Sequence, residues 1–202
     1  MTKLLTLVSL CAFASTALGS ALPTVPEAIQ AVINMVESSS DATELLSPSS
    51  EVNVTDAWTN EVVSVHNSYR AQYRAPAVTW SNDLYPGTLA WARQCEFHHS
   101  SGQGKYGENL FAGTGNPGPG LAQGVKSWMD EASKYDWNHP GFSSGTGHFT
   151  QVVWKNSKQV ACALADCRGG TIFPQASKYL VCRYAPAGNV QGQYPQNVGR
   201  HV

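Results

Sequence analysis

The spacing of hydrophobic residues divides the chain into a helical part and a strand-like part. Between residues 58 and 135, hydrophobic residues recur every three or four positions in three stretches, which is the period of an amphipathic helix. The first stretch follows Asp56, a suitable helix cap, the second follows Ser81 with Pro86 in or near its first turn, and the third spans 120–135. The hydrophobic positions are Trp58, Val62, Val65, Tyr69 and Tyr73; Leu84, Leu89, Trp91, Ala92 and Cys95; and Leu121, Val125, Trp128 and Ala132. The pattern predicts three helices.

Later in the chain the pattern predicts strands, in the runs 147–154, 159–166 and 178–185. In the first run the expected faces are Phe149, Gln151 and Val153 on one side and His148, Thr150, Val152 and Trp154 on the other. Helices followed by consecutive strands indicate an α+β fold with an antiparallel sheet. Because the strands alone would leave both sheet faces open, we expect helices on each face, as a three-layer α-β-α sandwich.

The start of the chain is typical of an exported protein. Residues 1–21 predict a secretory signal peptide, because a basic residue precedes a hydrophobic run and then small residues. Residues 22–56 predict a flexible acidic leader, since they carry six acidic residues and no basic or aromatic residue. Asn53 opens the glycosylation sequon Asn-Val-Thr. Residues 57–202 hold all six tryptophans and have the size of one domain.

The predicted domain is weakly basic. Of the 13 basic and 14 acidic residues in the chain, 12 basic and eight acidic residues lie in 57–202, which gives a net charge of about +4. These basic residues do not cluster as in a nucleic-acid interface. After the signal peptide, no stretch reaches the roughly 18 apolar residues of a transmembrane helix. We therefore expect a soluble, exported domain with no nucleic-acid partner and no transmembrane segment.

The cysteines predict disulfides. Cys11 belongs to the signal peptide, and an even number in the exported chain indicates two disulfides with three possible pairings. Cys162 and Cys182 lie centrally in two strand-like runs that look like neighbours in a sheet. If they pair, Cys95 must pair with Cys167, and closing that long loop stabilises the fold by about 4 kcal/mol on the chain-entropy model. No thiol then remains for nucleophilic or redox chemistry.

The string GFSSG at 141–145 has the letters of the nucleophile elbow of serine hydrolases. An elbow requires a strand before the serine and a helix after it. Here Asn-His-Pro precedes the string and a predicted strand follows it. Only His148 and His201 come later in the chain, with no convincing acid between them. We interpret the string as a flexible loop.

Four segments together carry a resemblance to a known family. They are FHHSSGQGKYGENLFAG (97–113), SWMDEASKYDWNHPGF (127–142), TGHFTQVVW (146–154) and CRYAPAGNV (182–190). In this order the chain resembles the CAP superfamily of cysteine-rich secretory proteins, antigen 5 and pathogenesis-related class 1 proteins, over about 57–195. With its acidic leader and single domain it is most similar to the secreted fungal members. The resemblance implies the α-β-α sandwich predicted above.

The resemblance also implies a central cleft with two histidines and two acids. Carried over residue by residue, these are His99, Glu108, Glu131 and His148, with His98 as the alternative to His99 in the doublet. The serine that follows His99 favours His99.

Such a cleft suggests three kinds of chemistry. Two neutral imidazoles, His99 and His148, suit Zn²⁺ or another divalent cation, which protonation would release below about pH 6. Alternatively, the two glutamates hold the histidines and backbone amides in a polar network without an ion. A metal-dependent protease or other hydrolase would use Glu108 or Glu131 as a base toward a metal-bound water. The HExxH motif of zinc proteases is missing, so we expect no enzyme.

The third candidate feature is an aromatic loop at 135–142. Tyr135, Trp137 and Phe142 have the aromatic-x-aromatic-x₄-aromatic spacing called a caveolin-binding motif, and fungal family members use the equivalent loop for sterols. Pro140 and Gly141 should break the preceding helix, which leaves the rings on an irregular segment. The alternative is that these rings pack in the core. The resemblance favours a secreted protein that binds sterols here, with fatty acids as possible ligands elsewhere and no protein partner indicated.

Overall fold

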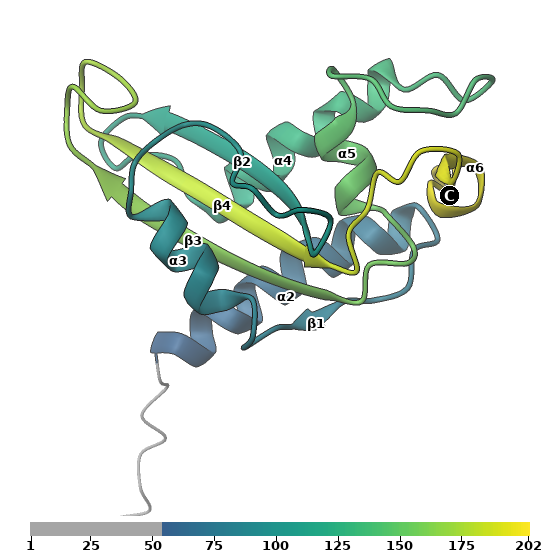
Figure 1. Ribbon diagram of the computed structural model, residues 1–202, viewed down its shortest axis with the longest axis horizontal. Helices are drawn as coiled ribbons and strands as arrows, with labels where there is room; N and C mark the ends of the chain where they lie inside the picture. Colours follow the sequence, from purple (N-terminus) through teal and green to yellow (C-terminus); the bar gives the residue numbers. More distant parts are fainter. Residues whose placement is uncertain (1–53) are drawn as a thin grey trace, which may run out of the picture. The chain divides into compact units, whose positions relative to one another are not determined.

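The computed structural model describes residues 54–202, with side chains from residue 56 onward. The signal peptide, most of the leader and the Asn53 sequon lie outside the described residues. In chain order (Figure 1) the elements are α2 (Val54–Gln72), β1 (Thr79–Trp80), α3 (Tyr85–Ala92), β2 (Gly107–Thr114), α4 (Leu121–Met129), the 3₁₀ helix η1 (Asp130–Lys134), α5 (Gly147–Val152), β3 (Gln159–Cys167), β4 (Ser177–Ala185) and α6 (Tyr194–Asn197).

The strands form one mixed sheet with the order β1-β3-β4-β2. The two long strand pairs, β3 with β4 and β4 with β2, are antiparallel, whereas the two-residue β1 runs parallel to β3. Strand β2 lies at an edge of the sheet, and its register places Glu108 opposite Arg183 and Asn109 opposite Cys182. The first residues of β2 therefore lie at the edge of the sheet, directly beside the buried strand β4.

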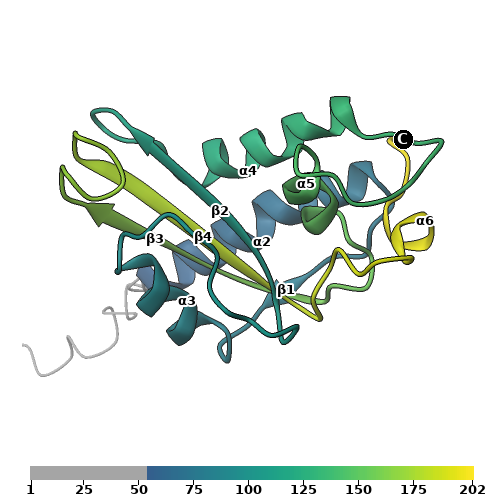
Figure 2. The ribbon, with the colours of Figure 1, turned by 45° about the horizontal axis from the view of Figure 1, so that its top comes forward.

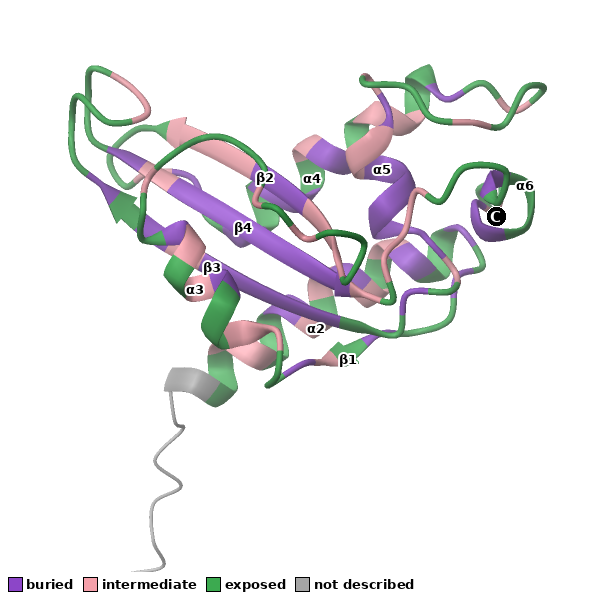
Figure 3. Cartoon of the chain, in the orientation of Figure 1, coloured by how far each residue is buried: buried purple, intermediate pink, exposed green. Residues whose placement is uncertain are grey.

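Helices cover both faces of the sheet, as predicted (Figures 1 and 2). Helix α3 packs on one face, and α2, α4 and α5 pack on the other. Side chains alternate along the central strands as the two-residue period requires. The residues facing α2 and α4 include Val160, Cys162, Leu180, Cys182 and Tyr184, and those facing α3 include Ala163, Ala165, Tyr179 and Val181. The three-layer α-β-α sandwich is confirmed, and β4 is almost wholly buried (Figure 3).

The strand predicted at 147–154 is wrong, because residues 147–152 form the helix α5. Four consecutive residues of α5 are buried: Phe149, Thr150, Gln151 and Val152. The segment therefore lacks the alternation of buried and exposed side chains that a strand with one exposed face would have. The carboxylate of Glu131 accepts the backbone N–H groups of His148 and Phe149 in the first turn. These tertiary contacts override the local strand preference of the Phe, Thr and Val residues.

Strand β2 was not predicted. Its sequence, GENLFAGT, has glycines and an acid where a strand normally carries β-branched residues. The segment is extended because every one of its residues pairs with β4. The other two predicted strands, β3 and β4, are confirmed within a residue or two of their expected limits.

Both predicted disulfides are present. Cys162 and Cys182 lie opposite each other in the register of β3 and β4 and are bonded. Cys95, just after α3, is bonded to Cys167 at the end of β3, 72 residues away in sequence. The Cys95–Cys167 bond therefore attaches the segment that leads to His99 to the end of strand β3. Among the described residues no helix is long and apolar enough to cross a membrane.

His66 lies in the core as a neutral imidazole. Its Nδ1–H donates to the carbonyl of Val62 (2.8 Å), so its Nε2 accepts from the hydroxyl of Tyr184 (3.0 Å). The side chain is fully buried, and desolvation lowers the pKa of His66 to about 4. The sulfurs of Cys162 and Cys182 lie within 4.8 Å of this ring, but their disulfide leaves no thiolate to bind a metal.

We expect His66 to make the fold acid-sensitive. Below about pH 6.5 the unfolded chain binds a proton at this position that the folded chain excludes until about pH 4. A fall in pH from 7 to 4 should therefore lower the free energy of unfolding by about 3 kcal/mol through His66 alone. His66→Gln, which does not titrate, should flatten this part of the profile measured by urea denaturation. An unchanged slope in the variant would contradict this role.

Candidate functional site

A cavity of about 220 Å³ opens beside the first residues of the edge strand β2. Its lining residues are His99, Glu108, Asn109, Phe142, Ser144, Gly147, His148 and Asn189. Three of the four predicted cleft residues thus line one cavity. The fourth, Glu131, lies in η1 and contacts His148.

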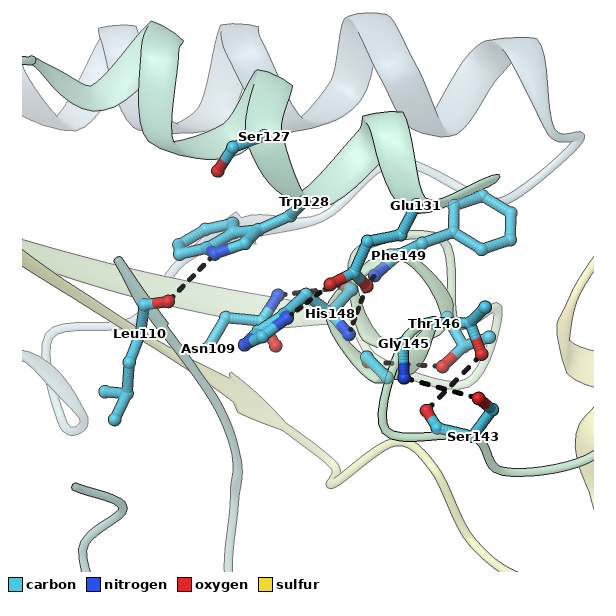
Figure 4. Close-up of polar contacts among 12 residues, drawn as sticks. Asn109, Leu110, Ser127, Trp128, Glu131, Ser143, Gly145, Thr146, His148 and Phe149 are labelled. Carbon is cyan, nitrogen blue, oxygen red and sulfur yellow. Dashed lines mark hydrogen bonds and ion pairs between the residues drawn. The ribbon is translucent and has the colours of Figure 1, made fainter. Parts of the chain in front are cut away.

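The first pair joins His148 to Glu131 (Figure 4). The imidazole Nδ1–H donates to Glu131 Oε1 at 2.7 Å, and the backbone N–H groups of His148 and Phe149 donate to Oε2 at 3.0 and 3.1 Å. The indole of Trp128 stacks against the imidazole with 6.1 Å between ring centroids. Glu131 therefore fixes the start of α5 and the orientation of the ring together, and His148 keeps Nε2 free of this pairing.

The second pair joins His99 to Glu108. The Nδ1–H of His99 donates to Glu108 Oε1 at 3.1 Å, and the carboxylate also accepts from the amide and hydroxyl of Ser100 and from Arg183 Nε. The His99 side chain is 61% exposed, whereas that of Glu108 is 5% exposed. His98 instead contacts Glu96, so the cleft histidine of the doublet is His99.

Arg183 is the buried counter-ion of this pair. Its guanidinium donates to Glu108 at 3.0 Å and to the hydroxyl of Ser100 at 2.9 Å, and it lies over the ring of Tyr106 at 4.3 Å. Burial alone would raise the pKa of Glu108, but hydrogen bonds from His99, Ser100 and Arg183 outweigh it and lower that pKa below its usual value. Glu108 is therefore ionised at neutral pH and is a weak proton acceptor.

The two pairs leave a defined set of metal-binding atoms. A carboxylate holds Nδ1 of each imidazole, as in metal sites where a histidine binds through its other nitrogen. A cation in this cleft would be held by Nε2 of His99 and Nε2 of His148, with water completing the shell. Among residues 56–202, the only three ligand-type side chains that converge within 4.8 Å are His66 and the two disulfide-bonded cysteines. The carboxylates of the cleft thus orient the imidazoles and are already occupied by donors.

The structure separates the three aromatic residues of the loop. Tyr135 is buried, with 6% of its surface exposed, and packs edge-on against Trp137 and Phe149. Trp137 is partly buried and lines a second cavity of about 400 Å³. Phe142 is 61% exposed and lines the first cavity beside His148. Only Trp137 and Phe142 are therefore accessible to a ligand, and they face different cavities.

The serines of GFSSG have no catalytic partner among the described residues. Ser143 Oγ accepts the backbone N–H of Gly145 within its own loop. The Nδ1–H of His148 donates to Glu131, as in a catalytic triad, but no hydrogen bond joins the imidazole to Ser143 or Ser144 within residues 56–202. A helix follows this loop, but no strand precedes it, so the elbow geometry is not formed.

Sequence reasoning missed the partners of the cleft residues. Arg183 is a charged residue inside the hydrophobic run of β4, and this was a usable signal, since a buried charge requires a partner. Asn109 and Asn189 hold the backbone of α5, because their amides donate to the carbonyls of His148 and Gly147. Nothing in the local sequence marks these two asparagines.

Comparison with known proteins gives consistent matches. The family described as "CAP: Cysteine-rich secretory protein family" matches residues 63–184. The chain is 38% identical over 144 residues to Protein PRY2 of Saccharomyces cerevisiae, with 70% of this chain and 41% of that protein covered. It is 36% identical over 142 residues to Secreted protein RBT4 of Candida albicans, with 69% and 37% covered. The chain therefore spans less than half the length of these fungal relatives.

A solved structure gives the same fold. The crystal structure of the hookworm platelet inhibitor matches with a TM-score of 0.56 at 19% identity, over 72% of this chain and 78% of that chain. At this identity the likeness supports the three-layer fold alone.

We expect Glu108→Gln to lower the free energy of unfolding by about 3 kcal/mol at pH 7, because Arg183 loses its buried counter-ion. The folded pKa of Glu108 lies below the unfolded value, so its stabilisation exists above about pH 4.3 and disappears as the pH falls through the folded pKa. Denaturation at several pH values should show the two proteins converging in acid.

Asp166→Asn is the control for this prediction. Asp166 pairs with Lys178 but its side chain is 83% exposed, so its loss should cost less than about 1 kcal/mol. Equal effects of the two substitutions at pH 7 would contradict the role assigned to Glu108.

Proposed function

The chain belongs to the CAP family of cysteine-rich secretory proteins, and from this premise we propose that it is an extracellular binding protein for small hydrophobic ligands, chiefly sterols. The loop 135–142 is the proposed sterol site. The observation that carries the proposal is Trp137, whose ring lines a cavity of about 400 Å³, within the range of ordinary ligand sites.

The surroundings of Trp137 suit a flat, rigid ligand. Tyr135 and Phe149 contact its ring edge-on, with centroids 4.8 and 6.2 Å away, and hold it from the core side. A ring fixed in this way loses little conformational entropy when a ligand stacks on it. Burial of about 300 Å² of sterol surface gives about 7 kcal/mol before the costs of association are subtracted.

Phe142 extends the apolar surface of the loop at its other end. It is one of the few large hydrophobic side chains with more than half of its surface exposed among the described residues. We assign it a secondary contact with the ligand, weaker than that of Trp137, because no aromatic side chain supports its ring in the way that Tyr135 and Phe149 support Trp137.

Three observations support an extracellular setting. The described residues form two disulfides, which persist in oxidising compartments. A hydrophobic signal-like segment begins the sequence. One of the fungal relatives described above carries the word "secreted" in its name.

A hydrolase is not favoured. Both cleft carboxylates are occupied by several donors, and the low pKa of Glu108 makes it a poor base at neutral pH. The same arrangement favours a bound divalent cation such as Zn²⁺, since it orients two imidazoles with free Nε2 atoms. We therefore propose a metal in the cleft, beside a ligand site for sterols and with fatty acids as further candidate ligands.

Trp137→Ala should weaken sterol binding by about tenfold or more, because it removes the largest apolar contact of the loop. Phe142→Ala should weaken it by less, about twofold to fivefold. Equilibrium binding of a radiolabelled sterol measures both effects, and thermal unfolding verifies that the variants fold. Phe97→Ala, which removes a ring with 54% exposure that lines neither cavity, is the matched control. Full affinity in the Trp137 variant would refute the sterol site.

For the metal, calorimetric titration with Zn²⁺ should show one site that His148→Ala removes. Glu131→Gln should weaken zinc by about tenfold, because the imidazole loses its orienting partner. His139→Ala removes an imidazole whose side chain is 87% exposed outside the cleft, and it should have no effect. Zinc retained in full by the His148 variant would rule out the cleft as the metal site.

A further inference from the structure

The cavity beside Trp137 carries a charge pattern that the sterol proposal alone does not explain. Its lining residues are Tyr73, Ala132, Ser133, Trp137, Arg200 and His201. Two of them are basic in type and none is acidic. Arg200 and His201, among the last residues of the described chain, thus form one wall of the cavity, and Arg200 lies beside Trp137 of the loop that follows η1.

Arg200 is placed to bind an anion in this cavity. Its guanidinium carbon lies 5.4 Å from the centroid of the Trp137 ring, as in a cation–π contact. Within residues 56–202, Arg183 is the only arginine that forms an ion pair, and its partner is Glu108. Arg200 therefore has no carboxylate partner among these residues. A guanidinium that stacks on an aromatic face still presents its N–H groups at its edge, where they match a sulfate or carboxylate.

The acids closest in sequence to the cavity are occupied elsewhere. Asp136 accepts hydrogen bonds from the backbone of Asn138 and from the backbone and ring of His139, within its own turn. Asp130 is paired with Lys126, and Glu131 with His148. His201 packs edge-on against Tyr73, with 5.2 Å between centroids, and adds an imidazole to the cavity wall. The cavity therefore combines a rigid aromatic face with an uncompensated cation.

We infer that the cavity selects sterols that carry an anionic group, a sulfate or a carboxylate, whose rings stack on Trp137 and whose charge binds Arg200. This inference rests on the proposed sterol site and specifies its substrate class. The rings supply apolar burial, and the anion supplies charge-assisted hydrogen bonds that a neutral sterol cannot make.

The test compares two labelled probes, a sterol 3-sulfate and the same sterol with a free hydroxyl, by equilibrium binding to the secreted protein. The wild type should bind the sulfate about tenfold more tightly. Arg200→Gln should reduce the ratio of the two affinities to about twofold or less, because only the sulfate loses a charged partner. Raising the salt concentration should reduce the preference in the wild type and have little effect in the variant.

Arg168→Gln is the matched control, because it removes the same charge from an exposed position that lines neither cavity, and it should keep the preference. Equal binding of the two probes by the wild type would overturn the inference and leave the sterol site standing. Binding of neither probe would overturn both. A straight-chain fatty acid that binds as tightly as the sulfate, with the same dependence on Arg200, would show that the cavity does not select sterol rings and would also overturn it.

Discussion

One buried cation, Arg70, holds together the part of the molecule that carries both candidate sites. Its side chain is fully buried at the end of α2, and it donates to the carbonyls of Pro76, Val152, Trp154 and Ser157 at 2.7 to 3.0 Å. Two of these carbonyls lie at the C-terminal end of α5, where a helix leaves its carbonyls unpaired. Burial lowers the pKa of Arg70 to about 10, so it remains charged at neutral pH. The position of α5 therefore depends on this contact.

Helix α5 then orients two neighbouring surfaces. His148, at its start, faces the cleft and is held by Glu131, whereas Phe149 faces the core and supports Trp137. The cleft is a rigid polar network, since each of its carboxylates accepts at least three hydrogen bonds. The cavity beside Trp137, called the aromatic cavity, has at its wall the cation of Arg200, which forms no ion pair within residues 56–202. This contrast favours the aromatic cavity for organic ligands and the cleft for a metal ion.

The sequence predicted the parts of the fold that local spacing controls. The three helices, strands β3 and β4, and the layered architecture followed from hydrophobic periods, and the cleft histidines and acids from family motifs. Helix α5 was misjudged as a strand because Glu131, distant in sequence, holds its first turn. Strand β2 was missed because its pairing with the distant strand β4 determines its conformation. The burial of Tyr135 was equally hidden, because the spacing of rings in an irregular loop does not show which of them face the core.

The most direct test of the aromatic site is the indole N–H region of a ¹H–¹⁵N correlation spectrum during titration with a sterol. The six tryptophans give six signals, and single Trp→Phe variants assign them. Trp128 stacks on His148 beneath the cleft, whereas Trp137 lines the aromatic cavity, so these two signals distinguish the sites. We predict that the Trp137 signal shifts and saturates while the Trp128 signal stays in place. A shift of Trp128 with an unmoved Trp137 would place the ligand in the cleft and contradict this account.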